Sequence, residues 1–284
     1  MSRLSTVSVI PCLSYVENDT DIISTQDAVV HVYAEEDFQE KGNLLAVEAL
    51  LTVLVNGKHL CSCMRLPGMD IELSAGLCYT QGVVQSRGEI FSVTRSGADI
   101  VEIKLKDFKK NIPGSASVIN SSGGFLKKED YNTIRSFRTP PSGDADAVSA
   151  DCMCMMAEDF FSRQEVFKMT GATQGAALYD CNCNFLAFAE DVGRHNALDK
   201  CIGRLFMDDT LENACFCMLT SRLSYGIIEK AVRTQIKVIA GVSAPTSLAV
   251  TLARNNDITL LGFFRSSRFN IYTGEGRIKR TPGL

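Results

Sequence analysis

A regular alternation of strand-like and helical runs after residue 173 constrains the fold of this chain more than any other feature. The strand-like runs are short and apolar, and they occupy residues 174–180, 184–190, 214–219, 236–240 and 258–264. The helical runs occupy residues 194–206, 223–234 and 245–254. Strands that alternate with helices predict a largely parallel sheet covered by helices, so the expected fold class is α/β.

The first half of the chain is dominated by strands. Asn56 and Gly57 separate two apolar runs, 46–55 and 58–64, which predicts a β-hairpin. Asp70 suits the N-cap of a helix over 70–82. Further strand-like stretches occupy residues 27–34, 89–95 and 99–107. We therefore expect a smaller, strand-rich α+β domain in this half.

Two stretches rich in Gly, Pro and Ser, at residues 108–124 and 138–144, mark loops or linkers. They divide the chain into an N-terminal α+β region over 1–140, which includes the loop at 108–128, and an α/β domain over 141–284. A helix predicted over 145–162 carries a stripe of Met and Cys residues, which we assign to packing.

Charge and hydropathy exclude several classes of protein. The chain has 284 residues with 29 basic and 33 acidic side chains, for a net charge of −4. A general nucleic-acid or membrane-surface binder needs an excess of Lys and Arg, so neither partner is expected. No apolar run reaches the ~18–20 residues of a membrane span. Residues 1–15 lack the apolar core of a secretory signal, so the expected location is the cytoplasm.

Eleven cysteines is a high number for a cytoplasmic chain. Four pairs have the form Cys-x-Cys, and they are Cys61/Cys63, Cys152/Cys154, Cys181/Cys183 and Cys215/Cys217. Free cysteines behave as small buried hydrophobes, and residues i and i+2 share one face of a strand. The alternative is metal or sulfur chemistry. Structural zinc sites usually have a wider spacing, which favours the first interpretation, and no metal site is expected.

Hydroxyl and guanidinium side chains follow three of the C-terminal strands. Ser221 and Arg222 follow the run 214–219, and Arg265 to Arg268 follow the run 258–264. After 236–240, Ser243 or Ala244 suits a helix cap, Pro245 the first helical position, and Thr246 follows. Ligands bind beyond the carboxyl ends of strands in open α/β sheets, and guanidinium groups bind phosphate oxygens. This pattern predicts a site for an anionic, nucleotide-like ligand; ordinary capping with solvated arginines is the alternative.

A polar run from Glu190 to Asn196 lies at another strand-to-helix junction. It holds Asp191, Arg194 and His195, and Gly193 permits a tight turn. His195 has two interpretations: it orients a ligand or moves a proton, or it caps the helix. A second turn, Thr170-Gly171, precedes the strand at 174–180 and is expected near the same sheet.

Several segments resemble one known family. They are Phe167-x-x-Thr170-Gly171-x-Thr173, the unbroken run from Glu190 to Lys200, the run from Ser243 to Ala249, Arg268-Phe269-Asn270-x-Tyr272, and, in the first half, the segment from Arg65 to Gly76. In this order, from about residue 45 to 275, they resemble the FdhD family of formate dehydrogenase accessory proteins.

The resemblance implies a cytoplasmic, homodimeric sulfurtransferase. Such a protein carries sulfur from a cysteine desulfurase to the molybdenum bis(molybdopterin guanine dinucleotide) cofactor before insertion into formate dehydrogenase, and GDP mimics that cofactor. It also implies a three-layer α/β/α, cytidine-deaminase-like C-terminal domain. The family's cofactor-contacting stretch matches residues 263–268. The candidate cofactor-binding residues are Thr170, Gly171, Asp191, Arg194, His195, Ser221, Arg222, Ser243, Thr246, Phe263, Phe264, Arg265, Ser266, Ser267 and Arg268.

The sequence departs from the family where sulfur is carried. Gly123 and Leu126 stand in place of the family's Cys-x-x-Cys, and Gln174 stands in place of a histidine. Only a thiolate can attack and carry a sulfane sulfur, so no catalytic residue is assigned. Three hypotheses remain: a carrier moved to Cys152 or Cys154, a cofactor-binding chaperone without sulfur transfer, or a metal-binding protein that uses the Cys-x-Cys pairs. The motifs of zinc deaminases are missing, so no catalytic zinc is expected.

Overall fold

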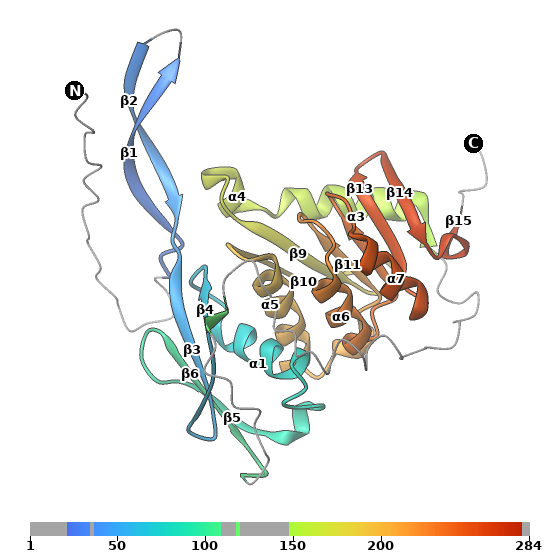
Figure 1. Ribbon diagram of the computed structural model, residues 1–284, viewed down its shortest axis with the longest axis horizontal. Helices are drawn as coiled ribbons and strands as arrows, with labels where there is room; N and C mark the ends of the chain where they lie inside the picture. The colour runs from blue at the N-terminus through green and yellow to red at the C-terminus, as the bar shows by residue number, and fades with distance from the viewer. Residues whose placement is uncertain (1–21, 35–36, 109–117, 120–147, 280–284) are drawn as a thin grey trace.

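The computed structural model describes residues 22–34, 37–108, 118–119 and 148–279, and its C-terminal half is built on a six-stranded sheet (Figure 1). The strand order is β10-β9-β11-β12-β13-β14. The strands are β9 (Gln174–Tyr179), β10 (Phe185–Asp191), β11 (Phe216–Leu219), β12 (Val238–Gly241), β13 (Thr259–Arg265) and β14 (Arg268–Thr273). The first five confirm the predicted runs to within about two residues at each end.

The sheet is mixed, so the expectation of a largely parallel sheet is wrong. Strand β12 pairs in parallel with β11 and β13, but β9 runs antiparallel to both β10 and β11, and β14 runs antiparallel to β13. The reason is visible in the sequence. No helix separates 174–180 from 184–190, and a short turn can join only antiparallel neighbours.

These directions bring several chain segments to one edge of the sheet. Strands β10, β11, β12 and β13 all end there, because β9 is antiparallel to both of its neighbours. Strand β9 begins at the same edge, with Gln174. We call this the carboxyl edge. It is where ligand-binding residues are expected in such sheets.

Helices cover both faces of the sheet. They are α3 (Ala150–Ser162), α4 (Glu165–Thr170), α5 (Arg194–Met207), α6 (Tyr225–Thr234) and α7 (Ser247–Asn255). Ala176 and Leu178 of β9 pack into the core beneath α5, α6 and α7, whereas Ala177 and Tyr179 pack against α3. In Figure 1, α5, α6 and α7 lie in front of the sheet and α3 behind it. The predicted helices at 194–206, 223–234 and 245–254 are confirmed, and the one at 145–162 is confirmed from Ala150 onward.

The N-terminal half contains a five-stranded sheet of order β5-β6-β3-β4-β7 and one helix. These elements are β3 (Ala49–Val55), β4 (Lys58–Arg65), α1 (Asp70–Thr80), β5 (Ile90–Arg95), β6 (Ile100–Leu105) and β7 (Val118–Ile119). Asn56 and Gly57 form the predicted hairpin turn, with left-handed φ angles of 49° and 74°. The N-cap of α1 is Met69 instead of Asp70, because the Asp70 carboxylate pairs with Arg65 and Arg95.

The two halves are joined by a close contact between α1 and α5. A Cβ atom on Gly203 would overlap the backbone carbonyl of Glu72, and one on Gly76 would overlap that of Asp199. Only glycine allows two helix backbones to approach so closely. One continuous core therefore includes α1, the N-terminal sheet and the α5 face of the C-terminal sheet. The expected domain boundary between 140 and 141 lies outside the described residues.

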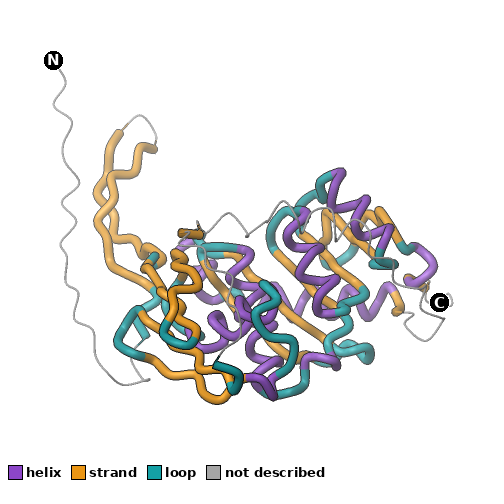
Figure 2. The backbone as a smooth tube through the Cα atoms, turned by 60° about the horizontal axis from the view of Figure 1, so that its bottom comes forward, coloured by secondary structure: helices purple, strands orange, loops and turns teal. Residues whose placement is uncertain are grey.

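Smaller pairings complete the fold. Strands β1 (Thr25–Ala34) and β2 (Asp37–Ala46) form an exposed hairpin arm that extends from the rest of the chain in both views (Figures 1 and 2). The polar sequence of β2 gave no strand signal. Strand β8 (Val148–Ser149) pairs in parallel with β15 (Ile278–Lys279). None of the described helices is long and apolar enough to cross a membrane.

The described cysteines fall into three groups. Cys61, Cys63 and Cys217 are buried among apolar side chains, as the packing interpretation predicts. Cys154 and Cys215 are partly exposed and Cys181 is exposed, so that interpretation is wrong for these three. Cys152 and Cys183, by contrast, form a disulfide between α3 and the turn after β9, which the sequence did not indicate. Among the described residues, no group of three or more His, Cys, Asp or Glu side chains could hold a metal ion.

Candidate anion site at the carboxyl edge

A cavity of about 420 Å³ opens at the carboxyl edge of the C-terminal sheet. Its wall is formed by Gln174, Val192, Arg194, Thr220, Ser221, Arg222 and Ser243. These residues come from the start of β9 and from the segments that follow β10, β11 and β12. Four of the predicted site residues, Arg194, Ser221, Arg222 and Ser243, are thus brought together.

The charge of the cavity is positive. Two guanidinium groups line it, and none of its described lining residues carries a carboxylate. The Nε atom of Arg194 is buried without a hydrogen-bond partner among the residues that the structure describes. Burial, and then repulsion from Arg222, lower the pKa of Arg194. An anion with several oxygen atoms would satisfy the free donors and relieve this repulsion.

A short chain of hydrogen bonds orients two further residues of the cavity wall, Gln174 and Thr220. The Gly175 amide donates to Thr220 Oγ1 at 3.0 Å, and Thr220 Oγ1 donates to Gln174 Oε1 at 3.0 Å. Because its oxygen is engaged, the Gln174 side chain has its amide N–H groups left to donate to a ligand. Gln174 therefore lies on the cavity and carries a donor.

Asp191 does not line the cavity. Its side chain is 0% exposed and pairs with Lys200 Nζ at 2.8 Å. It also accepts hydrogen bonds from the amides of Leu66 and Gly193 and from the Asn196 side chain. A buried carboxylate with this set of donors is fully satisfied. Asp191 is thus a structural residue, and its interpretation as a cofactor contact finds no support in the geometry.

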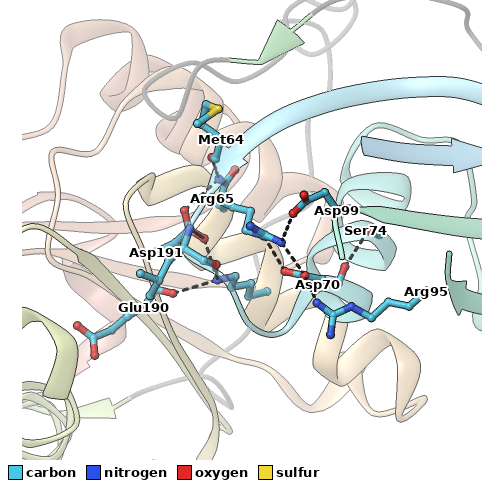
Figure 3. A network of polar contacts seen from close by, with 11 residues as sticks. Met64, Arg65, Asp70, Ser74, Arg95, Asp99, Glu190 and Asp191 are labelled. Carbon is cyan, nitrogen blue, oxygen red and sulfur yellow. Dashed lines mark hydrogen bonds and ion pairs between the residues drawn. The ribbon is translucent and has the colours of Figure 1, made fainter. Parts of the chain in front are cut away.

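The same network joins the run Glu190–Lys200 to the N-terminal half of the chain. Lys200 Nζ donates to the carbonyls of Leu66 and Glu190, and the Asn196 side chain donates to that of Met64. Figure 3 shows Arg65, the last residue of β4, extending toward the carboxylates of Asp70 and Asp99. The run Glu190–Lys200 therefore fastens the β4–α1 segment to the C-terminal sheet.

Glu190 holds the segment before β9. Its carboxylate accepts hydrogen bonds from the amides of Val166 and Phe167 at the start of α4 and from Thr173 Oγ1. At the end of α4, Thr170 Oγ1 donates to the Val166 carbonyl, and Gly171 adopts a left-handed φ of 68°. Thr170 and Gly171 thus terminate a helix and do not line the cavity.

His195 is a neutral, buried residue. It is 5% exposed, and burial, then Lys230 and Arg194, lower its pKa to about 3. Its Nδ1 atom has no partner among the described residues, and its ring lies against Gly226 of α6. A histidine with this pKa carries no positive charge near neutral pH. It does not serve as a cation for an anionic ligand.

The third predicted junction, after β13, is a hairpin that leads into β14. The Phe263 amide donates to the Ser243 carbonyl and Arg265 Nη1 to that of Val242, so this hairpin adjoins the cavity wall. Phe264 is buried and stacks on Phe269. Ser266, Ser267 and Arg268 are exposed near its tip.

Helix α7 begins later than predicted. Its N-cap is Thr246, whose side chain accepts a hydrogen bond from the Ala249 amide. Pro245 therefore precedes the helix, and neither Ser243 nor Ala244 is its cap. This frees Ser243 for the cavity wall and gives Thr246 a capping role.

Sequence reasoning left Gln174, Val192 and Thr220 out of the site. Val192 and Thr220 directly follow strands, so the rule that found their neighbours applies to them too. Gln174 was missed for a different reason. In a parallel sheet the first residue of β9 would lie at the opposite edge, and only the antiparallel direction of β9 brings it to the cavity.

Comparison with known proteins identifies the family. The model of the FdhD/NarQ family matches residues 46–279, which is most of the chain. The chain belongs to the FdhD/NarQ family. Sulfur carrier protein FdhD of Sulfurisphaera tokodaii is 37% identical over 217 residues, covering 76% of this chain and 82% of that protein. The protein of the same name from Mycobacterium tuberculosis is 35% identical over 253 residues, covering 82% and 91%.

A solved structure confirms the mixed α/β fold. It belongs to a protein from Desulfotalea psychrophila assigned as a formate dehydrogenase accessory protein. The two folds match with a TM-score of 0.76 at 22% sequence identity, over 90% of this chain and all of that one. Membership of the FdhD/NarQ family confirms the resemblance seen in the sequence. The cytidine-deaminase-like layering stays a prediction. Gly123 and Leu126 lie outside the described residues.

Proposed function

We propose that this protein is an accessory protein of formate dehydrogenase maturation that binds the molybdenum bis(molybdopterin guanine dinucleotide) cofactor at the carboxyl-edge cavity. This proposal rests on Arg194 and Arg222, two guanidinium groups in a cavity whose described lining residues include no carboxylate. Family membership and the description of the Desulfotalea psychrophila structure supply the connection to formate dehydrogenase. In this proposal the protein acts in the cytoplasm as a homodimer.

The cavity residues fit the phosphate groups of a guanine dinucleotide. The Nε of Arg194, which has no partner among the described residues, and the hydroxyl of Ser243 lie on one cavity wall as donors for phosphate oxygens, whereas the Ser221 hydroxyl donates to the Arg222 carbonyl. Arg194 is also the first residue of α5, where the positive end of the helix dipole favours negative charge. The cofactor is cargo here: the protein holds and orients it, and the molybdenum chemistry belongs to the client enzyme.

Sulfur transfer from a cysteine desulfurase is the second candidate function, favoured by the name sulfur carrier that the relatives bear. The described cysteines do not place a thiolate at the cavity. Burial raises the pKa of Cys61 and Cys78 to about 12, and it also raises those of Cys63, Cys201 and Cys217. Cys152 is in a disulfide, and the pKa of Cys154 is raised by burial and nearby carboxylates. These facts favour cofactor binding without transfer through a described cysteine.

Calorimetric titration with GDP tests the binding proposal. Arg222→Ala should weaken GDP binding at least about tenfold, or ~1.4 kcal/mol, because a charged phosphate contact is lost. Arg204→Ala is the matched control, since Arg204 is an exposed arginine of α5 that pairs with Asp208 and Glu72 and does not line the cavity, and it should bind like the wild type. Arg268→Ala tests the β13–β14 hairpin in the same way. Equal affinity of the wild type and Arg222→Ala would refute the site.

Persulfide mapping separates the two candidate functions. The protein is incubated with a cysteine desulfurase and cysteine, and persulfides are located by mass spectrometry. Cofactor binding without transfer predicts no labelled cysteine. A stoichiometric persulfide on Cys154 or Cys181 would instead establish this chain as a carrier.

A further inference from the structure

We propose that the Cys152–Cys183 disulfide is a reversible redox site, which a dithiol reductant opens to free the first turn of α3. The disulfide joins the third residue of α3 to the turn between β9 and β10, with the two Cα atoms 6.4 Å apart. This turn lies at the end of β9 away from Gln174, roughly 16 Å along the strand. The site is therefore separate from the anion cavity.

Both sulfur atoms belong to partly exposed residues. Cys152 and Cys183 are each of intermediate exposure, and the neighbours Cys181, Asn182 and Asn184 are exposed. By contrast, Cys61, Cys63, Cys78, Cys201 and Cys217 are buried in the core. A small dithiol, or a thioredoxin-type protein, can therefore reach this disulfide from the turn. A disulfide in a chain that keeps many free thiols is typical of redox-responsive sites.

The disulfide is not what holds α3 in place. Met153, Met156 and Phe160 are at most 2% exposed beneath the helix. The Tyr179 hydroxyl donates to the Met156 carbonyl and to Asp159, and Arg163 pairs with Asp159 and lies over the Phe185 ring. These contacts anchor the helix from Met153 onward. Besides the disulfide, the first turn is held by the Ser149 side chain, which accepts from the Cys152 amide, and by the two-residue β8–β15 pairing before it. Opening the disulfide should therefore loosen the first turn and leave the rest bound.

The exchange chemistry balances with a dithiol as the reductant. One thiolate of the dithiol attacks Sγ of Cys183, the S–S bond breaks, and Cys152 leaves as a thiolate that takes a proton from water. The N-terminal end of α3 stabilises this leaving charge. The second thiol of the reductant then displaces Cys183 and closes the reductant's own disulfide. Two electrons pass from the dithiol to the two cysteines.

Differential alkylation of the full-length protein tests the site. Thiols are blocked with N-ethylmaleimide, the protein is reduced with dithiothreitol or with thioredoxin, its reductase and NADPH, and newly exposed thiols are labelled. Cys152 and Cys183 should label only after reduction, whereas Cys154 and Cys181 should be blocked at the first step. Modification of Cys152 or Cys183 by N-ethylmaleimide before reduction would overturn the proposal.

Hydrogen exchange tests the structural consequence. Reduction should accelerate exchange of the amides of Cys152, which Ser149 caps, and of Cys154 and Met155, which bond to the first turn, at least about fivefold, and leave 157–162 unchanged. A Cys152→Ser, Cys183→Ser double variant should behave like the reduced protein, and the matched Cys154→Ser, Cys181→Ser variant like the oxidised one. No acceleration of these amides, or a double variant that fails to fold, would show a purely structural disulfide and refute the proposal.

Discussion

Two pairs of charged residues at or near the run Glu190–Lys200 differ in whether an opposite charge accompanies them. Asp191 and Lys200 are buried, bonded to each other and surrounded by backbone partners. Arg194 and Arg222 line an open cavity where the part of the chain that the structure describes places no carboxylate. The contrast shows that charged residues of one motif can have two different roles, one structural and one in binding. Charges that meet an opposite charge inside the protein build the fold, and charges that meet none are left for a ligand.

The largest expected effect concerns the buried pair. Lys200→Met leaves the Asp191 carboxylate buried without its cation, and we expect the free energy of unfolding to fall by about 3–5 kcal/mol. Urea denaturation followed by circular dichroism measures it. Arg204→Met, which removes exposed ion pairs with Asp208 and Glu72, should cost under about 1 kcal/mol. A loss for Lys200→Met no larger than that of the control would show that the network is not structural.

A pH-dependent effect comes next and concerns His195. Its folded-state pKa of about 3 lies below the ordinary 6.5, so its contribution to stability is full above pH 6.5 and is lost as pH falls toward 3. The slope is about 1.36 kcal/mol per pH unit, which gives roughly 2 kcal/mol of destabilisation between pH 6.5 and 5.

The control for this effect is a second histidine. Urea denaturation at pH 7 and pH 5 should show a smaller difference for His195→Gln than for the wild type. His31→Gln, at an exposed position of the β1–β2 arm, should leave the difference unchanged. If His195→Gln retains the full pH dependence, the histidine is not held neutral.

Arg194 should show the reverse of Lys200: its substitution should weaken ligand binding without lowering the stability of the fold. Arg194→Ala should weaken GDP binding at least about tenfold, or ~1.4 kcal/mol. Its unfolding free energy should not decrease, because the buried Nε has no partner among the described residues to lose. Calorimetry and urea denaturation of the same sample measure both quantities. A destabilised variant with normal affinity would place Arg194 in the structural class with Lys200.

The smallest effect concerns the orientation of Gln174. Thr220→Val removes the hydroxyl that bonds the Gln174 oxygen, and we expect about a threefold loss of GDP affinity, close to the ~0.7 kcal/mol of one hydrogen bond. Thr251→Val, which removes a similar hydroxyl from the surface of α7, should have no effect on affinity. Equal GDP affinities of the two variants would show that the orientation of Gln174 by Thr220 does not contribute to binding.

Much of the C-terminal fold was predictable because its elements are short, apolar and regularly spaced. Strands β9 to β13 and helices α5 to α7 lie where the pattern puts them. The strand-end rule also found Arg194, Ser221, Arg222 and Ser243. These are local consequences of sequence, since an apolar run fixes a strand and the residue after it is placed at an edge.

The rest depends on contacts between segments far apart in the chain. Nothing in the sequence near Asp191 shows that Lys200 and Leu66 satisfy it, so its structural role was not predictable. The direction of β9 relative to β11 depends on the strand order of the sheet, and it decided where Gln174 lies. The Cys152–Cys183 disulfide likewise joins residues 31 positions apart.

A crystal structure of the protein with GDP tests the central claim most directly. The diphosphate should lie in the carboxyl-edge cavity, within hydrogen-bonding distance of the guanidinium groups of Arg194 and Arg222, while Asp191 keeps its bond to Lys200. A nucleotide bound elsewhere, or one that contacts Asp191 and neither arginine, would contradict it.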